Sequence, residues 1–133
     1  MFFQDDLPAI SPQALKAFRA AAPEIIKETM QQSMRCKEDI AQHGDQAESL
    51  ITAGLGFTTH MLDSVMAFGA TALMTDELTW AADRLPHDGV TMQQVTNRLK
   101  IYRQIVIDKL SPGDSHEVAE YIDWMIVRLE SPV

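Results

Sequence analysis

The residues that could carry chemistry are few and lie far apart along the chain. The sequence holds one cysteine, Cys36, and four histidines, His43, His60, His87 and His116. A single cysteine excludes an intrachain disulfide and a multi-cysteine metal site. His116 and Glu120 are four residues apart and would share one face of a helix, but two ligands do not make a metal site. We therefore predict no metal site.

Catalytic motifs give no stronger signal. Cys36 lies between the basic residues Arg35 and Lys37, but no histidine–carboxylate partnership accompanies it in the sequence. The sequence contains neither a glycine-rich phosphate loop nor a GxSxG motif. The adjacent carboxylates Asp76 and Glu77 stand near the start of a predicted helix, where negative charge favours the helix dipole. These observations predict a protein that is not an enzyme.

The composition is that of a folded domain with an acidic balance. The chain of 133 residues, 46% of them hydrophobic and 23% charged, fits one domain spanning 1–133 with a core of its own. Its net charge of -8 would repel nucleic acids and anionic membrane surfaces. No apolar run approaches the ~18 residues of a membrane-spanning helix, and the acidic start at Met1–Asp6 does not match a secretory signal. We expect a cytoplasmic protein with no nucleic-acid partner and no membrane insertion.

Prolines and glycines divide the sequence into six predicted helices. Ser11 and Pro12 are typical of an N-cap followed by proline at the first helical position, and Pro23 would open a second helix that ends at Gly44. Ser115 would cap the last helix. The later helices are expected at about 46–69, 71–85, 91–110 and 115–129, and no useful strand pattern is present. The sequence therefore predicts an all-α fold whose short connections place consecutive helices against each other.

The segment 46–69 is the most apolar of the predicted helices. Its hydrophobic residues cover about half of the helix circumference, so we expect several helices to contact it and predict that it is central. Gly54 and Gly56 lower its helix propensity. We expect a crossing helix to approach its backbone closely at these two glycines.

One stretch of the C-terminal half resembles a known family. Asp88-Gly89-Val90-Thr91-Met92 leads into a predicted helix that contains Leu99-Lys100-Ile101-Tyr102-Arg103. This stretch is similar to the xGVxxxxLxxxLxxYRxxI pattern of bacterial globin-like sensor domains. These include the haem-free N-terminal domains of stressosome regulators and, more distantly, the globin-coupled sensors. The resemblance implies a single globin-like domain of about six helices, acting without haem as a non-catalytic regulatory or sensor domain in signal transduction.

The resemblance also implies an apolar pocket at the position that haem occupies in haem-binding relatives. The segments 46–69 and 91–110 would border this pocket, and Trp80 would cover it. A small apolar ligand is expected there, a fatty-acid-like molecule being one option. The ordinary alternative is that the same side chains simply fill the core. The residues expected to line the pocket are Phe57, Met61, Val65, Trp80, Leu99 and Tyr102.

A haem-binding globin, acting as a gas sensor or carrier, is the alternative function. Its ligands would be His87 and/or His60. On a helical wheel, however, His60 falls on the polar side of its helix, beside Asp63. Haem-binding sensors place the ligand about four residues before the glycine equivalent to Gly89, where this chain has Leu85. We therefore predict no cofactor and keep haem, and a structural helical module without ligand, as alternatives.

The last two predicted helices carry more apolar residues than one inward face needs. In globin-like sensors the corresponding helices commonly dimerise as a four-helix bundle, and surplus apolar surface indicates an interface. We expect a homodimer, and a signalling protein as a further partner. The residues expected at the dimer interface are Ile101, Ile105, Trp124, Ile126 and Val127.

Overall fold

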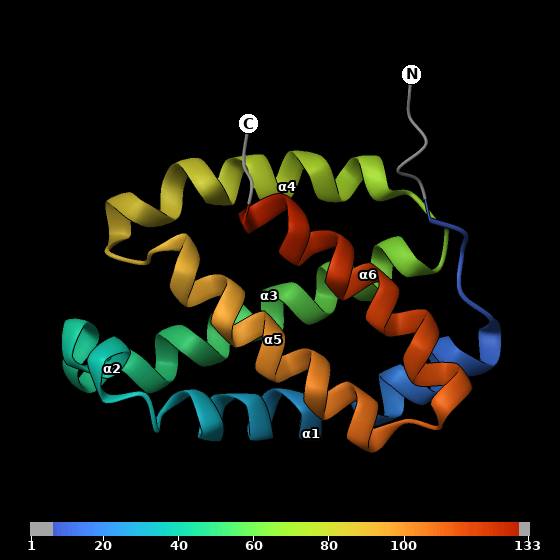
Figure 1. Cartoon of the computed structure of the whole chain (residues 1–133), viewed down its shortest axis with the longest axis horizontal. Helices are drawn as coiled ribbons and strands as arrows, with labels where there is room; N and C mark the ends of the chain where they lie inside the picture. The colour runs from blue at the N-terminus through green and yellow to red at the C-terminus, as the bar shows by residue number, and fades with distance from the viewer. Residues whose placement is uncertain (1–6, 131–133) are drawn as a thin grey trace.

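The fold is all-helical, as the sequence predicts (Figure 1). The computed structural model describes residues 7–130, except the side chains of residues 38, 39 and 42, and no strand occurs within that range. The segment Met1–Asp6 lies outside the described residues. The helices are α1 (Pro12–Ser33), α2 (Lys37–His43), α3 (Ala47–Met66), α4 (Thr71–Arg84), α5 (Met92–Lys109) and α6 (Pro112–Glu130). Two short 3-10 helices, η1 (Gly44–Gln46) and η2 (Leu85–Asp88), complete the set.

Helix α1 runs without a break through Pro23, so the prediction of two helices that divide at this residue is wrong. Proline lacks the N–H that would bond to the carbonyl of Arg19, a loss that usually ends or kinks a helix. Here Phe18 and Ile25, one on each side of the proline, are fully buried. Pro23 and Arg19 are exposed, so water can solvate the freed carbonyl. Core packing on both sides of Pro23 therefore offsets the local cost.

Most other helix ends follow the signals in the sequence. Ser11 is the N-cap of α1, and its Oγ accepts a hydrogen bond of 3.1 Å from the N–H of Ala14. Gly44, with φ of 57°, follows the last residue of α2, but the predicted helix that ends there is interrupted at Met34–Cys36, which separate α1 from α2. Thr91 and Gln94 form a reciprocal capping box at the start of α5. Ser11 and Gly44 have local physical roles that do not depend on the rest of the fold, which is why the sequence alone indicates them, whereas the capping box at Thr91 is seen only in the structure.

Helix α6 begins three residues earlier than predicted. Its first residue is Pro112, and Ser115 lies within the first turn rather than at the cap. The Oγ of Ser115 donates a hydrogen bond of 3.1 Å to the carbonyl oxygen of Pro112. The prediction of a cap at Ser115 is wrong because proline at the first helical position is itself a favourable start.

The core is built mainly by α1, α3, α5 and α6. Helix α1 packs against α3, α5 and α6, and α5 and α6 lie against each other (Figure 1). Helix α4 contacts α3 and α6. Helix α3 buries one side, including Ile51 and Leu62, but Leu50 and Phe57 on another side are about half exposed. The predicted contact of α3 with several helices is confirmed, since α1, α2, α4 and α6 all pack against it, although the part of its surface around Leu50 and Phe57 is left without a covering helix.

The glycines of α3 are not sites of close helix approach. A Cβ placed on Gly54 or Gly56 would have no atom of another element within 4 Å. The expectation of a crossing backbone at these positions is wrong. Such an approach occurs instead at Gly69, where a Cβ would lie 2.9 Å from the N atom of Ala9 and 2.9 Å from the carbonyl oxygen of Leu7.

The segment from Leu7 to Ser11 packs across the turn between α3 and α4 and is held there by hydrogen bonds. The N–H of Ile10 donates a hydrogen bond of 3.0 Å to the carbonyl oxygen of Met66. The Oη of Tyr121 on α6 donates one of 2.6 Å to the carbonyl oxygen of Pro8. These bonds tie the segment to α3 and α6, so it forms part of the folded domain.

Candidate ligand cavity

A cavity of about 440 Å³ lies at one end of the helical domain. Residues from the first two thirds of α3 and the first half of α5 line it, together with residues from the last half of α4 and the last turns of α6. This is the end at the left of Figure 1, where α4 turns into α5. Its volume falls within the ~300–1,000 Å³ typical of small-molecule sites.

The walls of the cavity are predominantly apolar. Helix α3 contributes Ile51 and Met61, α5 contributes Val95 and Leu99, and α6 contributes Met125. The thioether side chains of Met61 and Met125 can adjust to ligands of different shape. An apolar wall of this kind favours a ligand that buries hydrocarbon rather than one held by many hydrogen bonds.

The mouth of the cavity exposes unusually large apolar side chains. Six large hydrophobic residues are exposed in the described part of the chain, and three of them, Leu50, Phe57 and Trp80, line this cavity. Their exposed fractions are 47%, 49% and 57%. Grouped exposed apolar residues mark binding surfaces more often than single ones do. Covering the mouth with a ligand would therefore remove three of these six exposed apolar side chains from water.

Four ionisable side chains line the cavity, and they are not equivalent. Asp88 accepts a hydrogen bond of 3.3 Å from Nε of Arg84. Arg98 is half buried and already takes part in interactions within the protein. The Nε2 atom of His43 is covered by protein and has no hydrogen-bond partner among the described residues. Glu77 is exposed on α4 and forms no ion pair with any described residue.

These ionisable residues are the part of the site that the sequence analysis missed. His43 comes from α2, whose position relative to α3 depends on the turn at Gly44 and cannot be seen in the spacing. Arg98 precedes Leu99 on α5 and would fall beside the apolar stripe on a wheel. Glu77 and Trp80 are three residues apart on α4, and this spacing alone could have indicated that they share a face.

The structure brings four of the six predicted pocket residues to the cavity. Phe57, Met61, Trp80 and Leu99 line it, whereas Val65 and Tyr102 do not. Val65 lies one turn beyond Met61 on α3, and Tyr102 lies about one turn beyond Leu99 on α5. At those positions both side chains are buried in the packed core, with exposed fractions of 2% and 0%.

The histidines named for the haem alternative are not among the residues that line the cavity. His60 is exposed on α3, and His87 is exposed in η2. Neither lines the cavity, so neither is placed to bind the iron of a haem held there. His43 does line it, but its Nε2 is covered. These residues do not fit a haem site in this cavity.

Comparison with known proteins identifies no family for this chain. No family model, no curated protein and no solved structure matches this chain.

The residues predicted for a dimer interface are mostly inside the protein. Ile105, Trp124 and Ile126 are buried and Ile101 is half buried, whereas Val127 is exposed. The predicted surplus of apolar surface on α5 and α6 is wrong for the three buried residues. These residues fall outside the inward apolar stripe of each helix. In the structure, however, α1 packs against both α5 and α6, α4 packs against α6, and α5 and α6 pack against each other.

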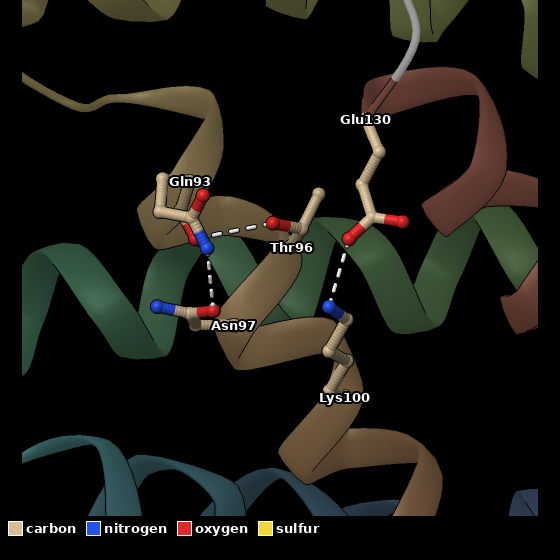
Figure 2. A network of polar contacts seen from close by, with 5 residues as sticks. All are labelled: Gln93, Thr96, Asn97, Lys100 and Glu130. Atoms are coloured by element: carbon tan, nitrogen blue, oxygen red, sulfur yellow. Dashed lines mark hydrogen bonds and ion pairs between the residues drawn. The ribbon is translucent and has the colours of Figure 1, made fainter.

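The outer surface of α5 and α6 is polar where the two helices meet (Figure 2). The Nζ of Lys100 lies 2.7 Å from Oε2 of Glu130, and Nε of Arg103 lies 2.6 Å from Oδ1 of Asp123. Along α5 itself, the side-chain amide of Gln93 donates a hydrogen bond of 3.0 Å to Asn97. Exposed pairs of this kind contribute little stability. They give this surface a charged character that an apolar interface lacks.

No group of three or more histidine, cysteine, aspartate or glutamate side chains is arranged to hold a metal ion within residues 7–130. No helix in that range combines the length and apolar character needed to cross a membrane.

Proposed function

We propose that this protein is a non-catalytic regulatory or sensor domain that binds a small apolar ligand in the cavity between α3, α4, α5 and α6. The observation that carries the proposal is a cavity of about 440 Å³ with apolar walls, whose mouth exposes Leu50, Phe57 and Trp80. A ligand would remove this surface from water, at about 25 cal/mol for each Å² of apolar area buried. The resemblance to globin-like sensor domains supports the proposal, since it places a ligand pocket between the same two segments, 46–69 and 91–110.

Ligand binding would regulate by favouring one arrangement of the helices around the cavity. Its walls come from four helices, and only a ligand with different affinities for two arrangements can shift the population between them. The readout that we propose is association, with a signalling protein or with a second copy of the chain. The exposed Phe68 and Leu73 near the α3–α4 turn, and Val127 on α6, are apolar surface outside the cavity that could serve such association.

A neutral fluorescent probe tests the proposal. N-Phenyl-1-naphthylamine becomes bright in apolar surroundings, and we expect a saturable rise of its fluorescence with the wild-type protein. Ala81 lines the cavity and the adjacent Ala82 does not, although both are half buried on α4. Ala81→Phe should fill part of the cavity and weaken probe binding about tenfold, whereas Ala82→Phe should not.

The pair of variants separates binding in the cavity from adsorption on the surface. Equal loss of probe binding in both variants, or binding that does not saturate, would count against a ligand in this cavity. Circular dichroism on both variants shows whether either substitution has disturbed the fold.

A further inference from the structure

We infer that the cavity prefers a cationic amphiphile, an apolar chain with an ammonium head, over a fatty-acid-like anion. This inference rests on the proposed function, since it names the chemical class of ligand for the same cavity. The observations that carry it are an unpaired carboxylate at the cavity mouth, an exposed indole three residues away on the same helix, and an acidic surround.

Glu77 and Trp80 form the recognition feature. They are separated by three residues on α4 and therefore lie side by side on one face of the helix, and both line the cavity. Glu77 is exposed and has no ion-pair partner among the described residues, and the indole of Trp80 is 57% exposed. An ammonium group placed over an indole face and beside a carboxylate gains both a cation–π and an ionic attraction.

The helices that flank the mouth are acidic. Helices α3 and α4 together carry five carboxylates and a single arginine, these being Glu48, Asp63, Asp76, Glu77, Asp83 and Arg84. Asp63 is paired with Arg19 at 2.6 Å, and Arg84 is paired with Asp88. The remaining negative charge around Trp80 is not neutralised by these pairs. A cationic head would be attracted to the mouth, and a carboxylate head would be repelled from it.

The positive groups of the cavity do not reverse this preference. Arg98 is half buried, already interacts within the protein, and has its Nε and Nη2 atoms covered by other atoms. The Nε2 atom of His43 is covered in the same way. An incoming anion would find these nitrogens shielded, whereas an incoming cation finds Glu77 and Trp80 open to solvent.

The predicted arrangement follows from these positions. The hydrocarbon chain would lie between Met61 on α3 and Leu99 on α5, within the apolar walls. The ammonium head would stay at the mouth, next to Trp80 and Glu77, where it keeps part of its hydration. No covalent step and no proton transfer is involved.

Three probes with ten-carbon chains test the inference by isothermal titration below their micelle concentrations. Decyltrimethylammonium, decanol and decanoate have chains of nearly the same length and differ in the charge, polarity and size of the head. At low ionic strength we expect the cation to bind about five- to tenfold more tightly than decanol, and decanoate to bind more weakly than decanol. The advantage of the cation should shrink in high salt.

Two glutamate variants locate the effect. Glu77→Gln should lower the ratio of the decyltrimethylammonium affinity to the decanol affinity to near one. Glu24→Gln, a matched change at an exposed glutamate of α1 outside the cavity, should leave both affinities as they are. Both side chains are exposed, so neither substitution threatens the fold.

The outcomes distinguish this inference from the proposed function. If decanol binds in the cavity but the cation has no advantage, or the advantage survives Glu77→Gln, the inference is overturned and the proposed function stands. If none of the three probes binds, both are overturned. Tighter binding of decanoate than of the cation contradicts the inference and restores the fatty-acid-like ligand that the sequence resemblance implies.

Discussion

The hydroxyl groups of Thr59 and Tyr102 lie 2.7 Å apart inside the core and join α3 to α5. Both side chains are buried, and burial raises the pKa of the Tyr102 hydroxyl well above its ordinary value of 10.0, while the hydrogen bond to Thr59 acts in the opposite direction. On α5 the bond lies about one helical turn from Leu99. It therefore joins α3 to α5 next to the turns of these two helices that line the cavity.

The first prediction is that Tyr102→Phe lowers the free energy of unfolding by about 1–2 kcal/mol, because it leaves the buried hydroxyl of Thr59 without this partner. Urea denaturation followed by circular dichroism measures the change. In a double-mutant cycle, the variant with both Thr59→Val and Tyr102→Phe should lose less free energy of unfolding than the sum of the losses in the two single variants. Strict additivity would show that the two hydroxyl groups do not interact.

The second prediction concerns alkaline pH. Above pH 10 the tyrosine of the unfolded chain loses its proton, whereas Tyr102 in the folded protein keeps it because its pKa is raised. The unfolded state then binds fewer protons than the folded state, so this residue makes the free energy of unfolding fall as the pH rises. The loss approaches about 1.4 kcal/mol for each pH unit.

Denaturation of wild-type protein and Tyr102→Phe at a series of alkaline pH values tests this slope. The substitution should remove the contribution of Tyr102 and flatten the curve above pH 10, while the two curves run parallel below it. Tyr121 is present in both proteins and does not affect the comparison. Curves that stay parallel throughout would contradict burial of a neutral Tyr102.

The third prediction contrasts two glycines. Gly56→Ala should raise the free energy of unfolding by about 0.5–1 kcal/mol, because alanine favours the interior of α3 and its Cβ meets no atom of another element within 4 Å. Gly69→Ala should lower it by about 1–3 kcal/mol. Gly69 has φ of 71° and the N-terminal backbone against it at 2.9 Å.

Thermal unfolding of the two variants beside the wild type checks this contrast. A melting temperature that moves in the same direction for both variants would contradict either the open space at Gly56 or the close backbone approach at Gly69. The stability of Gly56→Ala reports on the packing around α3, and that of Gly69→Ala reports on how the segment from Leu7 to Ser11 packs against the turn between α3 and α4.

The fourth prediction is that Pro23→Ala stabilises the protein. Alanine restores the N–H that can bond to the carbonyl of Arg19, and the helix already continues on both sides, so we expect a gain of about 1–2 kcal/mol in the free energy of unfolding. The gain is reduced because proline also restricts the unfolded chain. Denaturant titration measures it. A loss of stability would indicate that α1 is divided at Pro23, as the sequence alone suggested.

Local signals in the sequence predicted some helix ends, and tertiary packing accounts for part of what they missed. The Ser11 cap has a physical role within a few residues, so it could be identified in advance, whereas the break between α1 and α2 carries no such signal. Pro23 has an equally clear local meaning, but the burial of Phe18 and Ile25 on both sides of it outweighs that meaning. Burial across distant segments is not visible in spacing.

The candidate site shows the same division. The resemblance to globin-like sensor domains implies a pocket that Met61 and Leu99 line, and both residues line the cavity. The resemblance does not show where along the helices the cavity ends, which is why Tyr102, predicted to line the pocket, lies in the core instead. Neither the resemblance nor the spacing indicates Glu77, whose importance appears only once α4 is placed beside the mouth.

The measurement that tests the central claim most directly is isothermal titration of decanol into the wild-type protein and into Ala81→Phe and Ala82→Phe. We predict saturable binding of one decanol per chain in the wild type and in Ala82→Phe, with a negative heat-capacity change from buried apolar surface, and about tenfold weaker binding in Ala81→Phe. Absence of saturable binding in the wild type, or equal affinities in the two phenylalanine variants, would contradict a ligand site in this cavity.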